Sequence, residues 1–295
     1  MFIQQKLMVS LALVLSTASA SAGTLVYVIT GANQFGTVDL GTGSFQQIGP
    51  GTDPLDSLVP GPNGNLLSLS IFGDLESINP ATGVSSVIGA TGLGDVAGFL
   101  AKVGGTVYAT DLNSNLYTID PTTGASTLVG LTGLPAVPFV PGSINPDGSI
   151  NLFDETFYGV GGSLYATFDA VTIDPVTFAA TPLIDPALYQ IDPATGFTTL
   201  VASTLLNLDA SVQVGGVFYA FPGVVDGSGV PFGSLSYVYT LDLTNGNTSY
   251  VSAVDPSVPV IFGASPTPTP EPASVALAGI GIAAIIVSRR RRRHL

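Results

Sequence analysis

The residues that could do chemistry in this chain are almost all carboxylates. The 295 residues include no Cys, and the one His, His294, follows a run of arginines at the extreme C-terminus. Ser-His-Asp catalysis, Cys nucleophiles and zinc–thiolate sites therefore lack their essential side chains. Phosphate-binding loops need a Lys after a Gly run, whereas Lys102 precedes Gly104, so we expect it at a strand end. We predict no catalytic residue, no metal site and no bound cofactor.

Two carboxylates alone can hydrolyse a glycosidic bond. Between residues 23 and 270 the chain has two Glu, Glu76 and Glu155. Asp154 is adjacent to Glu155, and neighbours on a strand point to opposite faces. Because nothing in the sequence requires an acid pair to converge, we keep a carbohydrate-active enzyme that uses Asp and Glu only as an alternative.

Calcium is the most plausible ion for this chain. Asp111, Asn113 and Asn115 begin like a D-x-N-x-N calcium loop. Leu116 then stands where that loop needs Gly, and Thr122 stands where it needs Glu. We favour an Asx-rich turn and expect at most weak, diffuse calcium binding.

Charge is distributed very unevenly. Lys102 is the only basic residue between Lys6 and the C-terminal arginines, and residues 23–270 carry 19 acids, which makes a formal charge of −18. Such a surface repels phosphate backbones and excludes nucleic acid as a partner.

Both ends of the chain have the composition of targeting segments. Lys6, an apolar run and Ala20-Ser21-Ala22 predict a secretory signal peptide over 1–22. At the other end, a Pro-rich linker over 264–272 precedes a short apolar helix over 273–288, which we expect to cross the membrane. The tail 289–295 is expected in the cytoplasm because of its cluster Arg289, Arg290, Arg291, Arg292 and Arg293.

The order of these parts resembles the PEP-CTERM sorting signal: Pro270, Glu271 and Pro272, then an apolar helix, then terminal arginines. The resemblance covers about 25 residues. It implies recognition of Pro-Glu-Pro by an exosortase, a membrane-embedded transpeptidase, in a Gram-negative host that makes extracellular polysaccharide. It also implies transient anchoring in the inner membrane before release to the cell surface or extracellular matrix.

The middle of the chain is built from a repeat. A nine-residue unit has two apolar positions, then Asp or Asn, then Gly, and recurs at 35–43, 75–83, 116–124, 188–196 and 238–246. Short apolar and β-branched runs around an Asp-Pro-x-x-Gly turn predict a hairpin, so the repeated Asp is interpreted as a turn residue.

A second unit, Gly-Gly-x followed by an apolar residue and Tyr, precedes the hairpins, as at Gly104 and Gly161. With a further candidate strand before it, each unit of about 40 residues holds four strands, as in a propeller blade. We therefore predict an all-β propeller of five four-stranded blades over 23–263. Six blades, with a degenerate one around Val171–Pro175, is the alternative. Residues 258–262 are expected to complete the first blade.

Two insertions, 166–187 and 220–236, are apolar and rich in Pro or Gly. Exposed apolar loops would form a contact surface, whereas extra strands on a blade explain them equally well. Fold and composition together favour a non-catalytic propeller that binds extracellular polysaccharide. An Asp/Glu enzyme and a structural spacer without a ligand are the alternatives.

Overall fold

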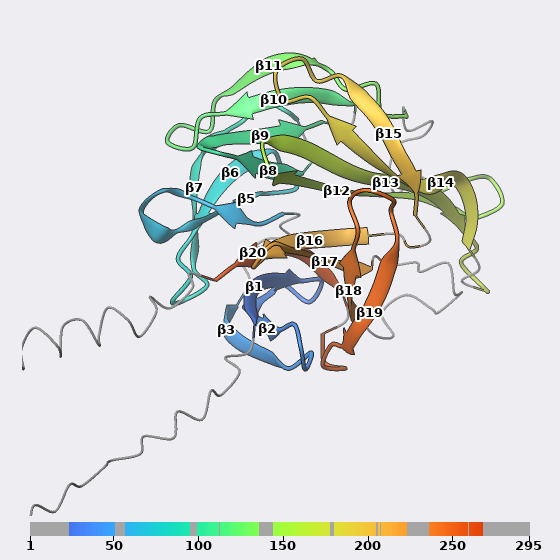
Figure 1. Cartoon of the computed structure of the whole chain (residues 1–295), viewed down its shortest axis with the longest axis horizontal. Helices are drawn as coiled ribbons and strands as arrows, with labels where there is room; N and C mark the ends of the chain where they lie inside the picture. The colour runs from blue at the N-terminus through green and yellow to red at the C-terminus, as the bar shows by residue number, and fades with distance from the viewer. Residues whose placement is uncertain are drawn as a thin grey trace, which may run out of the picture.

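The computed structural model describes residues 24–50, 57–94, 99–111, 113–135, 144–177, 180–204, 206, 208–222, 236–258 and 260–267. These residues form five four-stranded antiparallel sheets (Figure 1). Within them no α-helix occurs, and the single 3-10 turn is η1 (Pro62–Gly64). The predicted all-β, five-bladed propeller is confirmed. The predicted signal peptide, the helix 273–288 and the arginine tail lie outside the described residues.

Each blade is a meander whose strands follow one another from the channel outward. Blade 1 contains β20 (Ile261–Pro266), β1 (Leu25–Thr30), β2 (Gln34–Asp39) and β3 (Phe45–Pro50). Blade 2 contains β4 (Val59–Pro60), β5 (Leu66–Leu69), β6 (Asp74–Ile78) and β7 (Ser85–Ala90). Blade 3 contains β8 (Leu100–Val103), β9 (Thr106–Thr110), β10 (Asn115–Ile119) and β11 (Ser126–Leu131). Blade 4 contains β12 (Ile150–Val160), β13 (Ser163–Ile173), β14 (Ala180–Ile191) and β15 (Thr198–Ser203). Blade 5 contains β16 (Leu208–Val214), β17 (Val217–Pro222), β18 (Tyr237–Leu241) and β19 (Thr248–Ala253).

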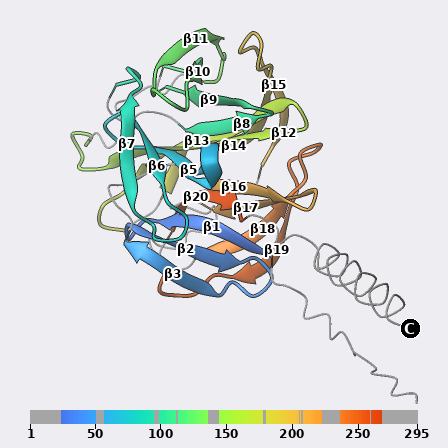
Figure 2. The same ribbon diagram turned by 90° about the vertical axis from the view of Figure 1, so that its left-hand side faces the viewer.

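The last strand closes the ring on the first. β20 pairs antiparallel with β1, from Val26 opposite Pro266 to Thr30 opposite Ile261 (Figures 1 and 2). The predicted closure is therefore confirmed, but the strand runs to Pro266 and extends the folded domain into the segment assigned to the linker, 264–272. Pro266 is tolerated because the inner edge of β20 has no further strand to receive an N–H.

The repeated hairpin turns dock each blade on the one before it. In blade 3, the Asp120 carboxylate accepts a hydrogen bond from the Thr122 N–H at 2.8 Å, so it is a turn residue as predicted. Gly124 has φ +81°, and a Cβ there would lie 2.5 Å from the carbonyl oxygen of Gly89 in blade 2. Gly is thus required twice, by the conformation and by the approach of the neighbouring blade. Turns of the other blades have glycines in the same conformation: Gly43, Gly83, Gly196 and Gly246.

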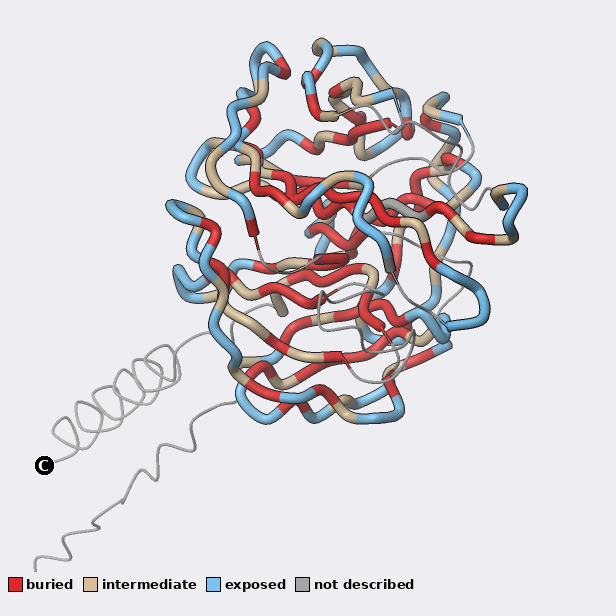
Figure 3. Tube along the Cα trace, turned by 90° about the vertical axis from the view of Figure 1, so that its right-hand side faces the viewer, coloured by how far each residue is buried: buried red, intermediate tan, exposed pale blue. Residues whose placement is uncertain are grey.

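The core lies between blades rather than within one sheet. One cluster packs Val26 and Val28 of blade 1 against Phe221 and Val238 of blade 5. Figure 3 shows the buried residues concentrated along the strands and the exposed ones at the turns and outer edges. Ring closure therefore buries apolar surface as well as pairing two strands.

The insertion 166–187 is no exposed loop. It lengthens β13 and β14, whose pairing runs from Leu164 opposite Ile191 to Ile173 opposite Ala180. Val171 lies within β13, so the alternative sixth blade is wrong: these residues extend blade 4. In the insertion 220–236, residues 223–235 lie outside the described part of the chain. No helix of the described residues is long and apolar enough to cross a bilayer.

Candidate functional site

The inner strands of the five blades enclose a cavity of about 400 Å³. Neighbouring inner strands contact one another around the ring, in the order β4, β8, β12, β16, β20. Equivalent register positions therefore form layers across the channel. The layer at the C-terminal ends of these strands consists of Pro60, Lys102, Gly159, Gln213 and Pro266, all of which line the cavity.

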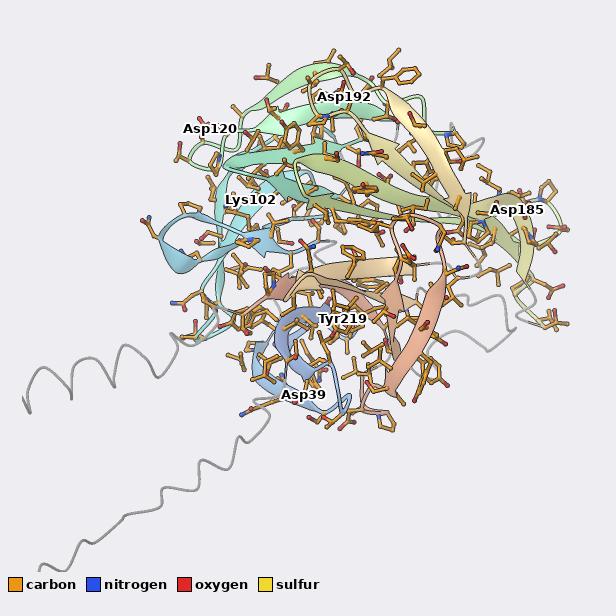
Figure 4. All side chains as sticks on the ribbon, in the orientation of Figure 1. Asp39, Lys102, Asp120, Asp185, Asp192 and Tyr219 are labelled. Atoms are coloured by element: carbon orange, nitrogen blue, oxygen red, sulfur yellow. The ribbon has the colours of Figure 1, made fainter. Side chains whose placement is uncertain are left out.

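Lys102, the only basic residue between Lys6 and the C-terminal arginines, belongs to this layer. Its ammonium group donates a hydrogen bond to the Pro60 carbonyl oxygen at 2.7 Å, which ties β8 to β4. Figure 4 shows Lys102 well inside the outline of the molecule, whereas Asp39, Asp120 and Asp192 lie at its periphery. Its position next to the end of β8 (Leu100–Val103) agrees with the predicted strand-end location.

Two β-bulges place side chains at the end of the cavity that is opposite the layer of Lys102. In β16, Leu208 pairs with Pro222 and Ala210 with Phe221, so Asp209 is an extra residue. In β20, the register shifts in the same way around Phe262. Bulges re-aim the inserted side chain, and both Asp209 and Phe262 line the cavity. Asp209 is the one acid among the described residues that do so.

Tyr158 lines the cavity and carries a buried hydroxyl. Its side chain is 5% exposed and lines the cavity, yet its hydroxyl has no hydrogen-bond partner among the described residues. The ring stacks on Tyr165 at 5.8 Å and tilts against Phe218 at 4.2 Å, so its position is fixed by packing. Burial raises the pKa of Tyr158 well above its usual value of 10, so the phenol remains a neutral donor.

Glu155 lies near the end of the channel that contains Asp209, but it faces the neighbouring blade. It follows regular pairing opposite Phe168, without a bulge. Its Oε1 accepts a hydrogen bond from the Thr110 hydroxyl at 2.9 Å. Burial, together with the charge of Asp111, raises the pKa of Glu155 from 4.5 to about 7, against the opposing effect of the Thr110 hydrogen bond. A buried carboxyl that keeps its proton up to about pH 7 therefore joins β12 to β9 through the Thr110 hydroxyl.

The calcium-like segment is arranged as a turn. Oδ1 of Asp111 accepts the Asn113 and Asn115 N–H groups, each at 2.9 Å. Its Oδ2 accepts hydrogen bonds from the Asn115 amide at 2.9 Å and from the Tyr117 hydroxyl at 3.1 Å. Both carboxylate oxygens thus serve donors of the chain itself, as in the Asx turn that the sequence favoured. Across the described residues, no three His, Cys, Asp or Glu side chains gather as a metal site would require.

The remaining predicted residues do not join this cavity. Glu76 is 3% exposed, and its Oε2 has no hydrogen-bond partner within the described residues. It lies on the face of blade 2 that includes Leu66 and Ile78, which pack against blade 1. Asp154 is opposite Asp169 in the β12–β13 ladder, and its side chain is outside the description. Pro270, Glu271, Pro272 and the five terminal arginines also lie outside the described residues.

Tyr158, Asp209 and Phe218 were not predicted as site residues. A strand before the Gly161 turn was predicted for blade 4, but its bounds, Ile150–Val160, were not. Asp209, the one charged residue of the strand 208–214, was a signal that could have been used.

The fold defines a five-bladed propeller, and comparison adds the sorting signal at its end. Residues 268–293 match the PEP-CTERM protein-sorting motif. This motif implies an exported protein that is anchored transiently in the membrane of a Gram-negative bacterium and processed by an exosortase. Comparison with curated proteins gives no match.

The solved structures with detectable similarity include the PQQ-bound form of an aldose sugar dehydrogenase from Streptomyces coelicolor, with 14% sequence identity and a TM-score of 0.38. The match covers 66% of the present chain and 62% of the dehydrogenase, so the chain spans less than two thirds of that structure.

Proposed function

We propose that the exported propeller is a non-catalytic binding protein of the cell envelope. Its channel takes a hydroxyl-rich, uncharged ligand, such as the end of an extracellular polysaccharide. The observation that carries this proposal is that Tyr158 lines the cavity and that its hydroxyl is buried with no partner among the described residues. Buried polar groups in proteins nearly always have a partner, and a bound ligand is the partner that we propose for this one.

The cavity favours a neutral ligand over charged ones. An anion would accept from Tyr158 and Lys102 but would face Asp209 and the strongly acidic surface. A simple cation would pair with Asp209 but could not accept a hydrogen bond from the phenol. A saccharide carries several hydroxyls that each donate and accept, so one of them can accept from Tyr158 while another donates to Asp209. The volume of about 400 Å³ lies within the range of small-molecule sites.

Binding of the host's own extracellular polysaccharide, and of short fragments of it, tests this function. We expect saturable binding without shortening of the polymer. Tyr158→Phe removes one neutral hydrogen bond worth about 0.5–1.5 kcal/mol, so the affinity should fall about two- to tenfold. Tyr165→Phe is the matched control, because its ring stacks on Tyr158 but it does not line the cavity. Equal affinity of the Tyr158 variant and the unmodified protein would contradict the proposal.

One observation favours the enzyme alternative. A buried Glu with a pKa of about 7, as for Glu155, suits a general acid. Its Oε1 is engaged by Thr110, and Glu155 is not among the residues that line the cavity. Shortening of the polymer that disappears in Glu155→Gln would put the enzyme first, and absence of all binding would favour the structural spacer.

A further inference from the structure

The two ends of the folded domain leave the ring from one face. In blades 3, 4 and 5 the inner strand turns into the next strand between Val103 and Thr106, Val160 and Ser163, and Val214 and Val217. At the equivalent place in blade 1, Val26 pairs with Pro266. The chain ends thus replace a hairpin turn, and we call the side of the ring with these turns the exit face.

The departing chain is fixed to the exit face. The Thr267 hydroxyl donates a hydrogen bond to the Leu25 carbonyl oxygen at 2.8 Å. Pro266 is still within the β20–β1 ladder. The sorting motif begins at residue 268, directly after this contact. No linker residue therefore separates the ring from the start of the motif.

The tether is short compared with the domain. From Thr267 to the predicted membrane segment, which starts at residue 273, a fully extended chain reaches at most about 20 Å. A compact domain of this size is about 45 Å across. The side opposite the exit face cannot turn to the bilayer on such a tether.

Charge keeps the exit face from adhering to lipid. In a four-stranded meander the first and third turns lie at the same end of the strands, so the repeated Asp turns also surround the exit face. Their carboxylates belong to Asp39, Asp120, Asp192 and Asp242. Anionic headgroups repel such a ring over about one Debye length, roughly 8–10 Å.

We propose that, while the tail is in the membrane, the propeller stands with its exit face toward the phospholipid headgroups. The end of the channel with Asp209 and Phe262 then points away from the bilayer, toward the extracellular matrix. The tether imposes this orientation, and adsorption of the acidic face does not contribute to it. The proposal rests on the membrane anchoring implied by the sorting motif and is independent of the ligand proposed for the channel.

A pair of single-cysteine variants tests the orientation in the full chain. The protein has no Cys, so Gly105→Cys and Asn113→Cys each carry one thiol for a fluorophore. Both positions are exposed, and a Cβ at Gly105 would meet no atom within 4 Å. Position 105 precedes β9 on the exit face, and position 113 follows β9 at its other end. The two labels therefore report opposite faces of the same blade.

The labelled proteins are reconstituted in phospholipid vesicles that contain a headgroup-labelled quencher lipid. We expect several-fold greater quenching at position 105 than at position 113. Equal quenching, greater quenching at position 113, or failure of the full chain to float with the vesicles would overturn the proposal. A long Gly/Ser insertion after Thr267 should make the two labels equal. A difference that survives this insertion would show that direct binding, and not the tether, orients the ring.

Discussion

Glu155 makes the stability of the propeller depend on pH in an unusual direction. Its pKa is raised from 4.5 to about 7 in the folded protein, chiefly by burial, and its side chain is 5% exposed. A raised folded-state pKa means that the folded state holds this proton more tightly than the unfolded state. The contribution to stability is complete below about pH 4.5 and is lost as the pH rises through 7. The loss is about 3 kcal/mol, since one pKa unit corresponds to about 1.4 kcal/mol.

The substitution Glu155→Gln removes this titration and keeps an oxygen that accepts from Thr110. Urea unfolding at fixed ionic strength, measured across pH 4.5–8.5, should show a fall in the unfolding free energy of the unmodified protein. That fall should be smaller in Glu155→Gln by about 3 kcal/mol. Repulsion within the acidic domain also changes with pH, but it acts on both proteins and cancels in the difference.

Asp120→Asn provides a control of opposite sign. Hydrogen bonds from the Thr122 hydroxyl and N–H lower the pKa of Asp120 below its usual value of 3.8. Its contribution is present above that value and is lost as the pH falls through the folded-state pKa, so its pH profile should depart from the unmodified protein only in acid. If Glu155→Gln and the unmodified protein fall equally between pH 4.5 and 8.5, the buried-carboxyl reasoning is refuted.

Three further predictions concern the ring, its surface and its tail. Gly124→Ala should lower the unfolding free energy by about 2 kcal/mol or more, because φ +81° and the Gly89 oxygen at 2.5 Å both oppose a Cβ. Gly105→Ala is the control, since a Cβ at that position would meet no atom within 4 Å. Equal urea midpoints of the two variants would contradict the docking role of the turn. Millimolar calcium should raise the melting temperature more than sodium at matched ionic strength, and an equal response would remove diffuse calcium binding. Replacing Pro270, Glu271 and Pro272 together by alanine should leave the protein in the membrane fraction of its host, whereas the control Thr269→Ala should be processed normally. Normal processing of the triple variant would show that Pro-Glu-Pro is not the recognised motif.

The hairpins of the ring could be predicted because their signal is local. Asp120 and Gly124 specify a turn by their own conformational preferences, and the same turn recurs in phase five times. Closure of the ring by the C-terminal strand could be predicted from the number of strands in each unit. The first unit lacks a leading strand, and the last unit is followed by an extra one. The exact pairing was missed by several residues, since strand ends depend on the partner strand.

The cavity could not be predicted, because it depends on contacts between blades. Tyr158 has the sequence context of a core residue, and only the assembled ring brings this residue to the cavity wall. The bulge at Asp209 arises from a mismatch between two paired strands, which neither strand encodes alone. Burial of Glu155 likewise comes from the blade that carries Thr110, which lies 45 residues earlier in the chain.

The pairing of β1 with β20 also determines when the protein can finish folding. The predicted signal peptide would deliver the chain from its N-terminus, so that Leu25–Thr30 emerges first and waits for Ile261–Pro266. Until then blade 1 has three strands and β1 is an open edge, a template for pairing with other chains. Contacts so distant in sequence form slowly. Since the sorting motif directly follows β20, the segment read by the exosortase becomes accessible at the same stage as the strand that completes the ring.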